Sequence, residues 1–147
     1  MTIIRNLAIL LFIGCSIPAF AGGTGYINYD RVVAEYNLAQ TTMREIQTKA
    51  DEIEKYLEAK EEEFSKIESA VQKKKFETTV RNEMKTKEAA FNDFRNKKEE
   101  IVYNKIHAVS EKIRLEKGLD AILDARCVFS GGVDITNELI TKLNSTN

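Results

Sequence analysis

The hydrophobic pattern is dominated by residues 26–117, a stretch of 92 residues that contains neither glycine nor proline. From Val32 onward, apolar residues recur at alternating steps of four and three, and only Lys60 interrupts them before Val71. The positions of this seam are Val32, Tyr36, Ala39, Met43, Ile46, Ala50, Ile53, Leu57, Lys60, Phe64, Ile67 and Val71. A period of about 3.5 residues held over such a length predicts a coiled-coil helix. We expect the helix to begin with Asp30 as its N-cap and the helical run to close at Gly118.

The pattern changes after Val71, where the seam loses its regularity and the charge changes sign. Residues 45–68 carry nine acidic residues and four lysines, whereas residues 73–98 carry nine basic residues and four acidic ones. Opposite charges stabilise two helices that lie side by side but contribute little to one helix that continues end to end. The sequence therefore predicts that residues 31–117 form an antiparallel helical hairpin. Its tip is expected at about residues 69–75, and each arm should be roughly 60 Å long.

The two ends of this run, residues 22–30 and 118–147, predict a small β body with a C-terminal helix. Strand-like residues occur in "GYINY" and at 121–124 and 126–129. Gly131 and Gly132 then predict a turn, and Asp134 is a candidate cap of the final helix. The apolar face of that helix comprises Ile135, Leu139 and Leu143. The fold class is thus mostly α, with a long hairpin projecting from a short-stranded sheet.

Three short strands and one short helix make a marginal domain by themselves, and the edges of such a sheet are open. Packing against other copies would close these edges, so we expect a homo-oligomer whose number the pattern leaves open. The residues expected to form this oligomerisation body are Tyr26, Ile27, Ile122, Leu123, Val128, Phe129, Ile135 and Leu139.

Residues 1–21 have the pattern of a secretory signal peptide, with Arg5 before an apolar run of 11 residues and "AFA" before the expected cleavage near Ala21. The alternatives are an uncleaved membrane anchor and lipid attachment at Cys15. Cleavage would leave Cys127 as the only cysteine, which excludes an internal disulfide. Because Cys127 lies in the apolar run "ARCVF", we expect it to be buried and inert.

Composition disfavours several function classes. Charged residues make up 31% of the chain, yet the net charge is only -1, which argues against a nucleic-acid-binding protein. His107 is the only histidine, so histidine-based metal sites and catalytic triads are not expected, and we predict neither an enzyme nor a cofactor. The cluster Lys73, Lys74 and Lys75 could contact an anionic membrane surface, or simply keep the tip of the hairpin solvated.

The signal sequence, "GYINYDRVVAEY", the charged hairpin and "GLDAILDARCVFSGGVDITNELITKL" together resemble the Skp/OmpH family of periplasmic chaperones over the whole mature chain. The resemblance implies a homotrimer in which strands from three chains form a β-barrel and three hairpins project around a cavity. It also implies an ATP-independent periplasmic holdase, whose partners are unfolded outer-membrane proteins. Under this interpretation, the side chains expected to contact clients are Phe64, Phe76, Phe91 and Phe94. The alternative for these aromatic residues is packing within the seam, most of all for Phe64.

One departure concerns charge, because many members of that family are basic. Without Arg5 the mature chain has 21 basic and 23 acidic residues, a net charge of about -2. Lipopolysaccharide binding is therefore not carried over to this sequence. The other function compatible with the pattern is a structural coiled-coil protein of the envelope that acts as a spacer or adaptor.

Overall fold

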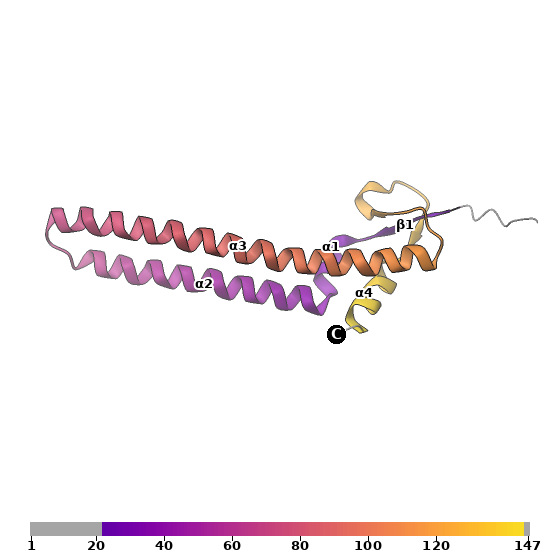
Figure 1. Ribbon diagram of the computed structural model, residues 1–147, viewed down its shortest axis with the longest axis horizontal. Helices are drawn as coiled ribbons and strands as arrows, with labels where there is room; N and C mark the ends of the chain where they lie inside the picture. The colour runs from indigo at the N-terminus through magenta and orange to yellow at the C-terminus, as the bar shows by residue number, and fades with distance from the viewer. Residues whose placement is uncertain (1–21, 146–147) are drawn as a thin grey trace, which may run out of the picture.

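The computed structural model describes residues 22–145 and shows a long helical hairpin that projects from a small body (Figure 1). In chain order the elements are β1 (Thr24–Ile27), α1 (Tyr29–Glu35), α2 (Asn37–Ser65), α3 (Ala70–Glu116), β2 (Ala121–Asp124), the 3-10 turn η1 (Ala125–Cys127), β3 (Val133–Asp134) and α4 (Thr136–Ser145). The predicted signal peptide at residues 1–21, its cleavage point near Ala21 and the lipidation alternative at Cys15 lie outside the described residues. Within residues 22–145, none of the helices combines the length and the apolarity that crossing a bilayer requires.

The predicted hairpin is confirmed, because α2 and α3 run antiparallel and pack along their length (Figure 1). The chain reverses at residues 66–69, a few residues before the expected tip. Ser69 caps α3, since its side chain accepts a hydrogen bond from the backbone N–H of Gln72 at 3.5 Å. Lys73, Lys74 and Lys75 consequently lie on the first turns of α3 rather than in the connecting loop.

The helical run does not begin as the seam predicted. The N-cap is Asn28, whose side chain accepts from the backbone N–H of Arg31 at 3.0 Å, and Asp30 already lies inside α1. The helix is then broken at Tyr36, where φ is -83° and ψ is 117°. Tyr36 is only 2% exposed, and its ring packs in the core of the body. The expectation of one uninterrupted helix is therefore wrong at this residue, where the chain changes direction as it enters the arm.

The sheet has the strand order β2-β1-β3, and both pairings are parallel. A parallel pair needs a long crossover connection, and the whole hairpin provides it between β1 and β2. The predicted strand at 121–124 is confirmed, whereas the one at 126–129 is wrong. There, the Asp124 carboxylate accepts a hydrogen bond from the backbone N–H of Arg126 at 2.9 Å, which turns the chain at the end of β2. The third strand follows Gly131 and Gly132 instead, whose φ values of 80° and 90° suit glycine.

The hydrophobic core lies in the body and at the base of the hairpin that joins it. Its buried residues are Ile27, Val32, Tyr36, Ala39, Val102, Ile106, Ile113, Leu119, Ile135, Leu139, Ile140 and Leu143. The predicted apolar face of the last helix is thus confirmed as the part of α4 that packs against α1 and α3. Along the arms, burial stops at Thr42 in α2 and Val102 in α3. Beyond these two residues, the hairpin has no fully buried side chain in the part of the chain that the structure describes.

Candidate functional site

The four phenylalanines expected to contact clients lie in the seam between α2 and α3, and each is half-buried. The rings of Phe64 and Phe76 are 6.1 Å apart and tilted by 40°, which joins the two helices near the tip. Phe91 and Phe94 line a small groove of about 180 Å³ with Ile53 of α2. All four side chains therefore make contacts within the hairpin, the packing that the sequence left as the alternative, while part of each ring is accessible.

Fewer ion pairs join the two arms than the charge pattern of the sequence suggested. Among the described residues, one ion pair connects α2 with α3, between Lys98 and Glu45 at 2.5 Å. Other lysines of the hairpin lie over aromatic rings, as Lys87 does over Tyr56 with its Nζ 4.3 Å from the ring centre. The Tyr56 hydroxyl donates a hydrogen bond to Glu83, and this bond is the main reason that the pKa of Tyr56 is raised to about 12. The arms are thus held by a thin polar and aromatic seam.

A groove of about 600 Å³ lies at the arm root, the place where α1, the first turns of α2 and the facing part of α3 meet. Met43 and Tyr103 line it and are 60% and 55% exposed. The seam pattern had placed Met43 against the partner helix. However, the break at Tyr36 changes the helical phase, so that Thr42 is buried in its place. Sequence reasoning missed this surface because nothing in the pattern marks the break.

The body uses some of the expected oligomerisation residues internally. Ile27, Ile135 and Leu139 are 8%, 1% and 0% exposed and pack in the core of the same chain. Tyr26, Ile122 and Val128 are half-buried. Leu123 and Phe129 are exposed, Phe129 completely, and so is Val133, which the sequence analysis did not single out. Since β1 is the central strand, β2 and β3 present the two free edges of the sheet beside these apolar side chains.

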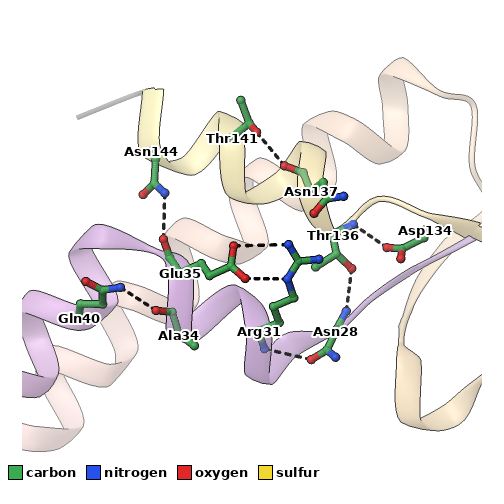
Figure 2. A network of polar contacts seen from close by, with 10 residues as sticks. All are labelled: Asn28, Arg31, Ala34, Glu35, Gln40, Asp134, Thr136, Asn137, Thr141 and Asn144. Atoms are coloured by element: carbon green, nitrogen blue, oxygen red, sulfur yellow. Dashed lines mark hydrogen bonds and ion pairs between the residues drawn. The ribbon is translucent and has the colours of Figure 1, made fainter.

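A polar network fixes the arm to the body at the helix break (Figure 2). Asn144 of α4 accepts a hydrogen bond from the backbone N–H of Asn37 at 3.0 Å and donates one to the backbone carbonyl of Glu35 at 2.9 Å. It thereby satisfies one backbone group on each side of Tyr36. Nearby, the Thr136 hydroxyl accepts from the backbone N–H of Asn28 at 3.0 Å and ties the start of α4 to the end of β1.

The remaining candidate residues are on the surface. Lys74 and Lys75 are exposed near Val71, which is 80% exposed, whereas Lys73 is half-buried with its Nζ 5.2 Å from the centre of the Phe64 ring. Cys127 is exposed, so the expectation of a buried thiol is wrong, because η1 leaves the sheet instead of continuing as a strand.

Two further findings concern metal ligands. Within residues 22–145, no group of three or more His, Cys, Asp or Glu side chains has an arrangement that could hold a metal ion. His107 is exposed and stacks against Tyr103, with ring centres 6.1 Å apart.

Comparison with known proteins identifies the family. The family described as outer membrane protein (OmpH-like) matches residues 23–143. No curated protein matches the chain significantly. Among solved structures, a Caulobacter crescentus protein described as OmpH-like is 14% identical, with 94% of this chain and 92% of that chain covered and a TM-score of 0.42. The assignment rests on the family match, which spans the body and both arms: the chain belongs to the OmpH-like family of outer membrane proteins.

Proposed function

We propose that this protein is an ATP-independent holdase chaperone of the periplasm, which binds unfolded outer-membrane proteins and prevents their aggregation. Membership of the OmpH-like family supports a chaperone-type role. The observation that carries the proposal is the hairpin itself. From Met43 of α2 to Ile101 of α3 its apolar side chains are half-buried or exposed, although such surface is normally covered in a stable helical protein.

A holdase needs many weak contacts rather than one specific pocket, because its clients share exposed apolar segments and not a sequence. Half-buried rings such as Phe91 and Phe94 can turn part of their surface to a client without unfolding the arm. The charged residues between them keep the free arms soluble. Lys74 and Lys75 at the tip add the means for a weak contact with an anionic membrane surface.

We further propose that the active form is a homotrimer in which the sheet edges of three chains close into one barrel. The free edges of β2 and β3 and the exposed side chains of Leu123, Phe129 and Val133 support this assembly. Covering these groups in an interface would add to the stability of a body whose own hydrophobic core is small. Three hairpins would then project from the barrel and enclose a client between them.

The test combines molar mass with aggregation. The mature chain, residues 22–147, is measured by light scattering and then mixed, at one trimer per client, with a β-barrel membrane protein diluted from urea. We expect a mass three times that of the chain and loss of client turbidity. The Phe129→Asp variant should lower both the mass and the protection. If the wild-type chain leaves the turbidity unchanged while an established holdase removes it, the proposal is wrong and the spacer or adaptor function is favoured.

A further inference from the structure

The groove at the arm root is formed by side chains from three helices whose relative positions are fixed by the core beneath it. Tyr29 and Val33 come from α1, Met43 and Ile46 from α2, and Tyr103 from α3. Ala39 and Val102 form its floor and are 2% and 7% exposed. Figure 1 shows this junction at the point where the arms leave the body. The groove is therefore present before any ligand arrives, unlike the thin seam of the outer arms.

The accessible walls of the groove are suited to apolar ligands of varied shape. Met43 and Tyr103 expose more than half of their surface although they are large and apolar, and they do so in a concave site. Methionine is unbranched and adapts to different partners, while tyrosine offers both a flat apolar ring and a hydroxyl. Such a combination favours binding of many related segments over recognition of one side chain.

The site extends toward the sheet. Tyr29 and Tyr103 also line a second groove of about 210 Å³, which includes Ile122 of β2 and Ser110 of α3. The Ser110 hydroxyl is buried and has no hydrogen-bond partner within residues 22–145. A buried hydroxyl without a partner is costly, so a ligand that brings a backbone N–H or carbonyl to this point would gain a hydrogen bond. The two grooves are adjacent, since they share Tyr29 and Tyr103, and together they accommodate an extended chain better than a compact molecule.

Charge decides which segments fit. Glu99 and Glu100 form the rim of the larger groove, and no basic side chain lines it. Glu99 has Arg95 at 3.9 Å, whereas Glu100 has no ion-pair partner in the part of the chain that the structure describes. The field at the larger groove is therefore negative, in contrast with the basic stretch farther out on α3, whereas Arg114 in the smaller groove is paired with Glu111 at 2.6 Å.

We infer that the arm root is a preformed binding site for an extended apolar segment of an unfolded client, and that it selects segments with neutral or basic flanks. The inference rests on the proposed holdase function and adds a location and a charge preference to it. A second copy of this chain could compete only at the smaller groove, which Ile122 of the edge strand β2 lines, because no residue of the sheet lines the larger groove.

The test uses two fluorescein-labelled peptides of alternating leucine and threonine, one flanked by lysines and one by glutamates. We expect the lysine-flanked peptide to bind the wild-type chain at least about tenfold more tightly than the other. The double variant Met43→Ser/Tyr103→Ser should weaken its binding about tenfold, since two large apolar contacts are lost. Ile101→Ser is the matched control, because Ile101 is 50% exposed on the same helix but does not line the groove, and it should change binding less than about twofold.

Equal affinity for the two peptides would overturn the charge preference, and unchanged affinity in the double variant would overturn the site. A lower molar mass of the folded double variant, checked by circular dichroism, would show that the groove holds another copy of the chain. These results are separable from failure of the proposed function. If the wild-type chain still suppresses client aggregation while the groove variants bind normally, only the location is wrong. If the wild-type chain suppresses nothing, the holdase proposal itself is wrong.

Discussion

Replacing Asn144 with alanine tests how the arm is fixed to the body. Its side chain makes two hydrogen bonds across the helix break at Tyr36, to the backbone N–H of Asn37 and to the backbone carbonyl of Glu35. Tyr36 provides no side-chain cap for α2, so the loss of Asn144 would leave the first amide of that helix to water alone. Figure 2 shows the hydrogen bond that the Asn144 side chain donates to the backbone carbonyl of Glu35.

The expected cost follows from these two contacts. Each hydrogen bond contributes about 1 kcal/mol to the free energy of unfolding, and alanine returns about 0.5 kcal/mol through its higher helix propensity. Asn144→Ala should therefore destabilise the protein by about 1.5 kcal/mol. Asn137→Ala is the matched control on the same helix, because the Asn137 side chain makes no hydrogen bond within the described residues. It should lie within about 0.5 kcal/mol of wild type.

The assay is urea unfolding followed by circular dichroism. All variants are compared at one protein concentration, because association would otherwise shift the midpoint. Hydrogen exchange gives a second measurement, in which the Asn37 amide should exchange faster in Asn144→Ala and not in Asn137→Ala. Equal midpoints for the two alanine variants would show that the two Asn144 hydrogen bonds do not fix the arm to the body.

Two further predictions concern titration. Tyr56→Phe should remove the tyrosine that ionises last, because the bond to Glu83 raises the pKa of Tyr56 to about 12. The contribution of this bond to stability is complete below pH 10 and is lost as the pH rises toward 12. Absorbance at 295 nm follows the ionisation, and unfolding at high pH measures the loss of stability. Glu138→Gln should flatten the acid limb of the pH–stability curve, since Lys117 holds the pKa of Glu138 below its ordinary value of 4.5. The contribution of ionised Glu138 to stability is present above pH 4.5 and is lost as the pH falls through the lowered pKa. An acid limb like that of wild type would refute this prediction.

The long-range features of the fold could be predicted because they depend on periodicity and charge, which the sequence displays directly. The antiparallel hairpin and the buried face of α4 are of this kind. Other features depend on competition between local and tertiary interactions. Tyr36 fits the apolar period, yet burial of its ring in the body outweighs the continuation of the helix. Arg126 and its neighbours have strand-like composition, but the Asp124 carboxylate bonds the backbone of Arg126 and turns the chain. Cys127 becomes exposed as a consequence.

The candidate site could be predicted only in part for the same reason. The seam placed Phe64 between the arms, where it lies against Phe76, but it could not show which side chains the helix phase leaves exposed. Met43 and Thr42 exchange places because α2 restarts after Tyr36, and Met43 thereby becomes an exposed wall of the groove at the arm root. A tyrosine at a regular seam position gives no sign that the helix will break there.

If the protein is the holdase that we propose, the distribution of burial separates the residues that stabilise the fold from those that would bind a client. Two helices side by side can bury only a narrow strip of each other, so a hairpin of α2 and α3 cannot form a core of its own. Its stability must come from the core in the body and at the base of the hairpin, where the fully buried residues gather, and from the Asn144 hydrogen bonds that join arm to body. Apolar side chains farther out are then free to exchange a half-formed contact in the seam for a contact with a client, at little cost to the fold. An arm with a complete core would be more stable and would have no such surface to offer, so under the proposed holdase function the sparse packing of α2 against α3 is what would allow the arms to bind.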